Sequence, residues 1–378
     1  MTPFAFNTVP ALDMAWQGAG RLGEILSTRF AARKLFLITD AGLVKAGLIA
    51  PVEADLRRAG FSVTIFDAVV ADPPEAVLLQ AVDLAKQAGA DIVLGLGGGS
   101  SLDISKLVAV LLHGSQSLAE MYGIGNVKGT RAPLVLVPTT AGTGSEVTNI
   151  AIITTGATTK MGVVSPQLYA DYVLLDAALT TFLPKLHTAA TGIDAMVHAI
   201  EAYTGRHKKN PVSDALAREA LRLLGGNLIA VCQDGGNREA REAMLLGAML
   251  AGQAFSNSPV GAVHALAYPL GGHYHVPHGL SNALMLGPVL RFNETAAGPL
   301  YAELAGVLGA GSSAAAFVSH METLMNASGA PRRLREVGVT DNSLAMLAAD
   351  AMKQTRLLQN NPVEVTEADA LALYREAF

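Results

Sequence analysis

Histidines and an acidic residue fall in two short stretches of the sequence, where their types and spacing can bind a metal ion. Asp194 and His198 are four residues apart in a stretch with helical spacing, so their side chains share one face of the predicted helix. Four of the nine histidines lie within a further 15 residues, at His264, His273, His275 and His278. A carboxylate with imidazole nitrogens suits a borderline divalent ion such as Fe²⁺ or Zn²⁺. The Asp194–His198 pair alone is typical of an ordinary helix surface, and the second stretch makes a metal site the better interpretation.

Two segments rich in glycine and hydroxyl groups follow predicted strands. Gly97, Gly98, Gly99 and Ser100 come directly after the apolar run 91–96. Glycines there let the backbone approach a pyrophosphate, and the next helix begins with unpaired N–H groups. The segment 138–146 (PTTAGTGSE) follows another apolar run, and its hydroxyls can contact phosphate, ribose or a nicotinamide amide. Each segment alone is compatible with a tight turn, but two of them at strand ends favour a nucleotide site.

Asp40 ends the first clear predicted strand. A carboxylate at this position can accept hydrogen bonds from the ribose hydroxyls of an adenosine, and it would repel a 2′-phosphate. The alternative is an acidic residue that merely terminates a strand.

The elements that position these residues change character along the chain. Short apolar runs at 34–39, 61–66, 91–96 and 134–137 alternate with stretches of helical spacing. This order predicts a parallel, Rossmann-like α/β sheet with right-handed connections. After about residue 184, long Ala-, Leu-, Glu- and Arg-rich stretches with helical spacing, such as 212–224, 238–255 and 344–355, predict helices alone. We therefore expect an α/β domain over 1–184 and an all-helical domain over 185–378.

Composition narrows the class of protein. The 378 residues are 51% hydrophobic and 16% charged, which supplies ample material for two cores. A net charge of −5 without a basic run argues against nucleic acid as a partner. No run approaches the roughly 20 apolar residues of a membrane helix, and no signal peptide is visible. The single cysteine, Cys232, allows neither an intramolecular disulfide nor a thiolate-rich zinc site, so a cytoplasmic location is expected.

Four motifs together make the sequence similar to one known family. They are GGGSSLD (97–103), PTTAGTGSEVT (138–148), ATGIDAMVHAIEAY (190–203) and HALAYPLGGHYHVPHG (264–279). In this order and spacing the chain resembles the iron-containing (group III) alcohol dehydrogenases over essentially its whole length. The resemblance implies a dehydroquinate synthase-like architecture, with an α/β domain, a helical domain, and NAD(P) and a metal ion in the cleft between them.

The resemblance also assigns roles to individual residues. The family's metal ligands fall on Asp194, His198, His264 and His278. Its cofactor contacts fall on Asp40, Gly97, Gly98, Gly99, Ser100, Asp103, Thr139, Thr140, Thr143 and Lys160. The acidic residue at position 40 implies NAD rather than NADP, and the full ligand set implies Fe²⁺, with Zn²⁺ as the alternative. The partners implied are a small alcohol or aldehyde and a second copy of the chain, in a homodimer or larger homo-oligomer.

Two positions depart from the family pattern. Many members carry a histidine four residues after the third ligand, where this chain has Tyr268. A proton relay then falls to Tyr268 itself, to His273 or to His275, and an aromatic wall is the alternative role for Tyr268. Asp72 stands where the family usually has asparagine, which puts one cofactor contact in doubt.

The chemistry implied is the interconversion of an alcohol and an aldehyde or ketone. A divalent ion can lower the pKa of bound water from about 15.7 to about 7, and a bound alcohol should behave similarly. The resulting alkoxide then gives a hydride to the nicotinamide. A maleylacetate reductase and a hydroxyacid–oxoacid transhydrogenase are the alternatives among enzymes. A non-catalytic nucleotide-binding scaffold or a metallohydrolase fits the ligands and the glycine segments less well, and nothing in the sequence selects a particular alcohol.

The role expected for Asp40 gives a first prediction. Replacing its carboxylate in Asp40→Ser should relax the discrimination against NADP, because the repulsion of the 2′-phosphate is lost. We expect the ratio of kcat/KM for NAD to that for NADP to fall about tenfold or more, which corresponds to ~1.4 kcal/mol. Steady-state kinetics with both cofactors measures this ratio, and an unchanged preference would count against the ribose role.

Overall fold

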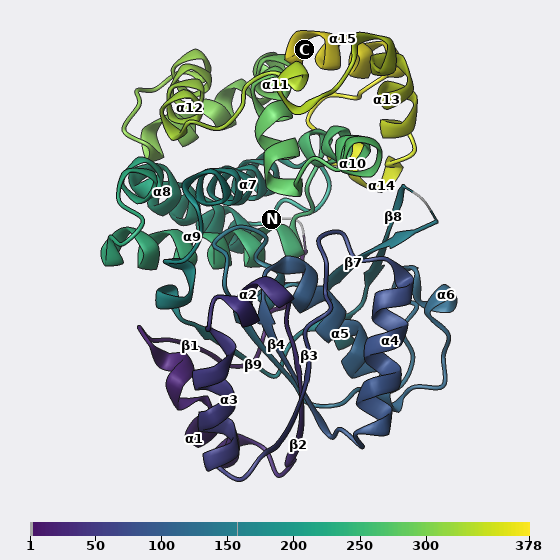
Figure 1. The fold of residues 1–378 in the computed structure, drawn as a ribbon. Coiled ribbons are helices and arrows are strands. Elements are labelled where there is room, and N and C mark those ends of the chain that lie inside the picture. Colours follow the sequence, from purple (N-terminus) through teal and green to yellow (C-terminus); the bar gives the residue numbers. More distant parts are fainter. Residues whose placement is uncertain (1–2, 157) are drawn as a thin grey trace. The chain divides into compact units, whose positions relative to one another are not determined.

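The computed structural model describes residues 3–156 and 158–378, and the chain divides into two compact units (Figure 1). The α/β unit comprises Thr8–Thr140 and Ser145–Phe182. The helical unit comprises residues 3–7, Ala141–Gly144 and Leu183–Phe378. The predicted fold class is confirmed, since a parallel sheet occupies the first part of the chain and helices dominate the second.

Six parallel strands form the sheet of the α/β unit, in the order β1-β9-β6-β4-β2-β3. Their bounds are β1 (Leu12–Met14), β2 (Lys34–Ile38), β3 (Ser62–Phe66), β4 (Ile92–Gly97), β6 (Leu134–Pro138) and β9 (Tyr172–Leu175). The four apolar runs of the sequence correspond to β2, β3, β4 and β6. Sequence reasoning missed β1, which has three residues and is largely exposed, and β9, which lies between two short helical turns.

Helices cover both faces of this sheet (Figure 1). Alternate residues of the strands, such as Leu35 and Leu37 of β2, form a buried cluster with α1 (Leu22–Arg29) and α3 (Ile49–Arg58). On the other face α5 (Gly99–His113) packs against β4 and β6, with α4 (Glu75–Gln87) beside it. Burial on both faces explains why these strands read as continuous apolar runs.

The remaining elements of the α/β unit are short. A second sheet has the order β5-β8-β7, with β5 (Gly123–Ile124), β7 (Ile150–Thr155) and β8 (Thr159–Val164). Two short α-helices are α2 (Ala41–Lys45) and α6 (Leu118–Met121). Single 3-10 turns are η1 (Gly18–Arg21), η2 (Ser145–Val147), η3 (Pro166–Leu168) and η4 (Ala177–Thr180). The β7–β8 hairpin was not predicted, because most of its residues are only partly buried, unlike those of the central strands.

The strand order reverses between β2 and β4. From β2 the chain moves outward to β3, then returns to the other side of β2 and continues through β4 to β6. The helices that follow β2 and β4, α3 and α5, therefore lie on opposite faces of the sheet, and open α/β sheets bind ligands at such a switch point. Asp40 follows β2, Gly97 ends β4 and Thr139 follows β6, so all three lie at one edge of the sheet.

Long helices make up the helical unit. They are α7 (Lys185–Thr204), α8 (Pro211–Gln233), α9 (Arg238–Asn257), α10 (Ala262–Tyr274), α11 (His278–Val307), α12 (Ala314–Ser328), α13 (Leu344–Ala351), α14 (Thr355–Leu358) and α15 (Glu367–Ala377), with turns η5 (Leu334–Val337) and η6 (Asp341–Ser343). Helix α7 is central, because it packs against α8, α9 and α11 and is buried along most of its length. The stretch with helical spacing at 344–355 is helical up to Ala351, where α13 ends, and α14 begins at Thr355.

Within the described part of the chain, no helix has the length and apolar character to span a lipid bilayer.

A glycine fixes the path of the short Ala141–Gly144 segment in the helical unit. Gly144 has φ +60°, and a Cβ there would lie 2.5 Å from the Cα of Gly252 on α9. We expect Gly144→Ala to lower the free energy of unfolding by about 2 kcal/mol or more, since both backbone strain and overlap oppose it. Denaturant titration monitored by circular dichroism measures the change.

Gly226→Ala is the matched control on α8. Apart from its chain neighbours and the adjacent backbone of α8, no heavy atom of the described residues lies within 4 Å of its added Cβ. This variant should match the wild type or exceed its stability by up to about 1 kcal/mol, because alanine favours helix. Equal effects at the two glycines would contradict the steric account.

Candidate metal centre

Helix α7 supplies a carboxylate and an imidazole from one buried face. Asp194 and His198 are one helical turn apart, and each is at most 3% exposed. A buried carboxylate is unfavourable unless a counter-charge or hydrogen-bond donors satisfy it. The burial of this polar pair on the most enclosed helix of the unit therefore indicates a built site and excludes the ordinary helix-surface alternative.

Two further histidines reach the same place from neighbouring helices. His264 lies in the first turn of α10 and is 2% exposed, and His278 is the first residue of α11. Gly279 allows α11 to approach α7 closely, because a Cβ there would lie 2.7 Å from the carbonyl oxygen of Ala190. The side chain of His278 is 29% exposed, so the group is open on its side.

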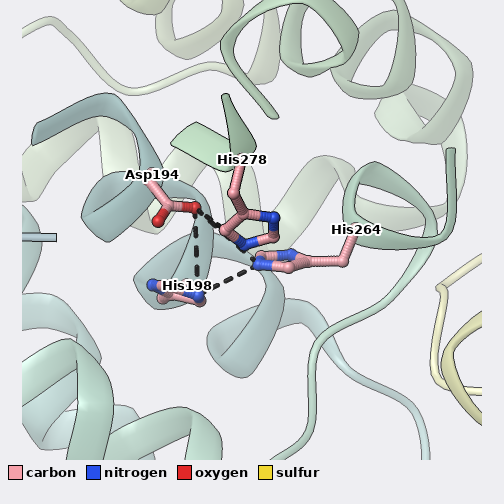
Figure 2. Close-up of side chains that lie close together, drawn as sticks. All are labelled: Asp194, His198, His264 and His278. Carbon is pink, nitrogen blue, oxygen red and sulfur yellow. Dashed lines mark hydrogen bonds and ion pairs between the residues drawn. The ribbon is translucent and has the colours of Figure 1, made fainter. Parts of the chain in front are cut away.

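The four side chains turn toward a common centre (Figure 2). Their ligand atoms all lie within 4.8 Å of one another. From Asp194 Oδ1 the distances to Nε2 of His198, His264 and His278 are 3.9, 3.9 and 3.7 Å. Ligands at about 2.1 Å around a tetrahedral ion lie about 3.4 Å apart, so this spacing is close to that of a coordination sphere. The donor set and its geometry fit a divalent ion such as Fe²⁺ or Zn²⁺.

Burial sets the protonation of the group. It lowers the pKa of His198 to about 3, despite the opposing charge of Asp194, so this imidazole is neutral and its lone pair can serve as a ligand. Burial alone would raise the pKa of Asp194, but the three histidines and a hydrogen bond from Asn282 hold it below its usual range. The centre thus offers one anionic oxygen and a neutral nitrogen at ordinary pH.

Two residues that sequence reasoning missed contact these side chains. Asn282 Nδ2 donates to Asp194 Oδ1 at 2.5 Å and lies 3.2 Å from His264 Nε2 and 3.3 Å from His278 Nε2. Glu201 Oε2 lies 2.7 Å from His264 Nδ1. Helical spacing was the available signal: Asn282 is four residues after His278, and Glu201 is three after His198.

Aromatic rings flank two of the histidines. Phe255 of α9 stacks on His198, with ring centroids 4.3 Å apart and planes inclined by 18°. This contact holds the imidazole in its plane and covers one side of it with apolar surface. Tyr268, one turn after His264 on α10, lies against His278 at a centroid distance of 6.0 Å. Tyr268 is therefore next to the cluster, where it can form a wall or carry a hydroxyl toward a ligand.

The other two candidates for a proton relay lie farther along α10. His273 Nε2 contacts Asp350 Oδ2 of α13 at 3.0 Å. It follows His264 by nine residues, which is about 13 Å of helix rise. His275 is exposed and ends α10 with φ +53°. The contacts of His273 join two helices, so Tyr268 is the candidate that the structure places beside a predicted ligand.

In the α/β unit, several predicted cofactor residues lie at the switch-point edge of the sheet. Asp40 caps α2, where its carboxylate accepts a hydrogen bond from the N–H of Leu43 at 3.1 Å. Gly97 ends β4, Gly98 precedes α5, and Gly99 and Ser100 form its first turn. The start of this 15-residue helix presents N–H groups beyond β4, as anion binding requires.

The residues that follow β6 divide between the two units. Thr139 and Thr140 belong to the α/β unit, and the N–H of Thr139 donates to the carbonyl of Gly97 at 3.0 Å. Thr143 belongs to the helical unit. Asp103 has internal partners for both oxygens, because Oδ1 accepts from Ser145 Oγ at 2.5 Å and Oδ2 from the N–H of Ile152 at 2.9 Å.

Lys160 forms an ion pair with the residue that departs from the family pattern. Its Nζ lies 2.6 Å from Asp72 Oδ1, and its side chain is 5% exposed. Lys160 stands on β8 opposite Thr154, whose hydroxyl donates to the carbonyl of Asp72. Asp72 therefore joins the loop before α4 to the β7–β8 hairpin.

Family comparisons match the N-terminal and C-terminal parts of the chain to the same protein family. Residues 14–177 match the family described as iron-containing alcohol dehydrogenase, and residues 188–378 match the C-terminal part of the Fe-containing alcohol dehydrogenase family. The chain is 40% identical to long-chain-alcohol dehydrogenase 1 of Geobacillus thermodenitrificans over 376 residues, covering 96% of this chain and 94% of the relative.

Solved structures show the same likeness. A 1,3-propanediol oxidoreductase superposes with a TM-score of 0.95 at 33% identity, with all of both chains covered. The sulfoacetaldehyde reductase of Bifidobacterium kashiwanohense, solved in complex with NAD⁺, superposes with a TM-score of 0.91 at 26% identity, covering 100% of this chain and 99% of that one.

The hydrogen bond from Asn282 to Asp194 gives a prediction for the metal-free protein. Asn282→Ala leaves a buried carboxylate without this donor, so we expect the free energy of unfolding to fall by about 1–3 kcal/mol. Denaturant titration after chelation measures the loss. Asn227→Ala, which removes an amide that donates to the carbonyl of Leu223 in the preceding turn of α8, is the control and should change stability little. A metal-free Asn282→Ala protein as stable as the wild type would contradict the assignment.

Proposed function

Because the chain belongs to the iron-containing alcohol dehydrogenase family, we propose that it is an NAD- and metal-dependent enzyme that interconverts an alcohol and an aldehyde or ketone. The observation that carries this proposal is the meeting of one carboxylate and three imidazoles at a single point of the helical unit. A nucleotide-binding scaffold has no need of such a group, so the scaffold alternative loses its support.

The proposed ligands of the ion are Asp194, His198, His264 and His278. A divalent ion bound there supplies Lewis-acid chemistry, which polarises a carbonyl and makes a hydroxyl more acidic. A single anionic ligand among neutral ones preserves most of the positive charge that this chemistry needs. Fe²⁺ is the metal proposed, with Zn²⁺ as the alternative that the same ligands accept.

The chain's own side chains shape the reaction. Phe255 excludes water from one side of His198, and His278 lies on the accessible side, where a substrate oxygen can approach. Tyr268 is proposed as the group that passes a proton between substrate and solvent or that lines the pocket. His273 and His275 are the weaker candidates for this relay, because one contacts Asp350 and the other is exposed.

NAD is proposed to bind at the switch-point edge of the α/β unit. Gly97, Gly98, Gly99 and Ser100 would take the pyrophosphate at the start of α5. Asp40 would take the adenosine ribose and disfavour NADP. The positions carried over from the family are Asp103, Thr139, Thr140, Thr143 and Lys160. The NAD⁺ complex of the sulfoacetaldehyde reductase supports the choice of cofactor.

Finer properties are also proposals. Domains at 1–184 and 185–378 rest on the change in periodicity near residue 184, and a cytoplasmic location rests on the single cysteine. A homodimer or larger homo-oligomer rests on the family resemblance. The substrate class is a small-molecule alcohol or its carbonyl partner. Relatives are named for a long-chain alcohol, 1,3-propanediol and sulfoacetaldehyde, so membership of the family leaves the individual substrate open.

Removing one proposed ligand tests the function. His264→Ala should lose its bound metal and lower NAD-dependent alcohol oxidation at least about 100-fold, equivalent to ~2.7 kcal/mol of transition-state stabilisation. Metal content by mass spectrometry and turnover are measured on the same samples. The control is His207→Ala, an exposed histidine outside the cluster, which should retain both. A His264→Ala enzyme that keeps its metal and its turnover would refute the ligand assignment.

A further inference from the structure

Glu201 completes a row of three polar residues on one face of α7. Asp194, His198 and Glu201 occupy positions i, i+4 and i+7 of the same helix. The Glu201 residue is 7% exposed. A buried carboxylate on a central helix needs partners, and both oxygens of Glu201 find theirs on α10.

One oxygen of Glu201 contacts the ring of a proposed ligand. Oε2 lies 2.7 Å from His264 Nδ1, while Nε2 of the same ring lies 3.0 Å from His198 Nε2. An ionised carboxylate can only accept a hydrogen bond, so Nδ1 must carry the proton. The lone pair of a neutral His264 is then on Nε2, the atom that faces the other ligand atoms.

The other oxygen of Glu201 holds the backbone beside this ring. Oε1 accepts from the N–H of Val263 at 2.7 Å, in the first turn of α10. Gly261 precedes this helix and has no side chain to cap it. Glu201 therefore accepts a hydrogen bond from the Val263 N–H, which has no partner within the helix, at the positive end of α10. It also contacts the imidazole of the following residue, His264. One carboxylate fixes both the position and the rotation of His264.

We propose that Glu201 is a positioning residue, which sets the tautomer and ring orientation of His264 and so raises the affinity of the centre for its metal ion. This inference rests on the metal-binding function proposed above. Carboxylates behind ligating histidines have this effect generally, and losing one lowers metal affinity about 10–100-fold. In this chain α7 thereby provides two ligands directly and controls a third that belongs to another helix.

Thr204 provides a matched control on the same helix. Glu201 and Thr204 both line a small cavity, with a water-accessible volume of about 10 Å³. The Thr204 hydroxyl donates to the carbonyl of Ile200 and is buried, as Glu201 is. Thr204→Val therefore disturbs the same space and the same helix without removing a contact to His264.

The test uses full-length protein freed of metal and titrated with Co²⁺. Glu201→Gln keeps the size of the side chain, but its amide can offer a donor to Nδ1 and so loses control of the tautomer. We expect the Kd for Co²⁺ to rise about 10–100-fold and the visible Co²⁺ absorption to change. Thr204→Val should leave both unchanged. Thermal melts of the metal-free proteins separate this effect from a role in stability alone.

The outcomes distinguish this inference from the function on which it rests. Wild-type protein that fails to bind Co²⁺ would overturn the proposed function. Wild-type protein that binds it while Glu201→Gln binds equally well would overturn the positioning role alone. Nitrogen-15 NMR of the metal-free wild type gives an answer even if Glu201→Gln fails to fold. His264, assigned from the spectrum of His264→Gln, should carry its proton on Nδ1, and a proton on Nε2 would overturn the inference.

Discussion

The negative charge of Asp194 is the constraint on which the rest of the centre depends. Removing a carboxylate from water costs several kcal/mol even after the protein relaxes, and Asp194 is 1% exposed. One hydrogen bond from Asn282 offsets only part of this cost. The pKa of Asp194 is nevertheless held below its usual range, so this carboxylate carries its negative charge at ordinary pH. A divalent cation among the four ligand atoms resolves the problem, because it supplies positive charge and uses the imidazole lone pairs.

The helical unit meets this constraint with few elements. Helix α7 places Asp194 and His198 on one face, and α10 and α11 each add a single histidine near their N-terminal ends. Close helix contact is essential, and Gly279 provides it between α11 and α7. Phe255 then fixes the plane of His198 from α9. The site is thus built on packed helices rather than on loops, which suits a centre that must keep its geometry.

Much of the architecture could be predicted from the sequence, because buried parallel strands and long helices leave strong periodic signals. Strands β2, β3, β4 and β6 and the change to helices near residue 184 are examples. Strand β1 and the β7–β8 hairpin gave no such signal, since they are short or only half buried. The helix expected over 344–355 breaks after Ala351, although its composition favours helix throughout.

The candidate site, too, could be predicted from the sequence only in part. The four-residue spacing predicted that Asp194 and His198 share one helix face. The family resemblance then identified His264 and His278, out of four clustered histidines, as the other two metal ligands. Helical spacing places Glu201 near His198 and Asn282 near His278, but it does not show that Glu201 contacts His264 or that Asn282 contacts Asp194, on other helices. The hydrogen bond of Asp103 with Ser145 and the ion pair of Lys160 with Asp72 join residues far apart in the sequence, so they could not be predicted from local patterns either.

The central claim is that a single divalent ion sits between the four ligand atoms. Anomalous X-ray diffraction at the iron and zinc absorption edges, on crystals of the purified protein, tests it most directly. The account predicts one anomalous peak per chain, about 2.0–2.2 Å from Asp194 and from the Nε2 atoms of His198, His264 and His278. Crystals of metal-supplied protein with no anomalous peak at this site, or with the metal peak at another site, would contradict this claim.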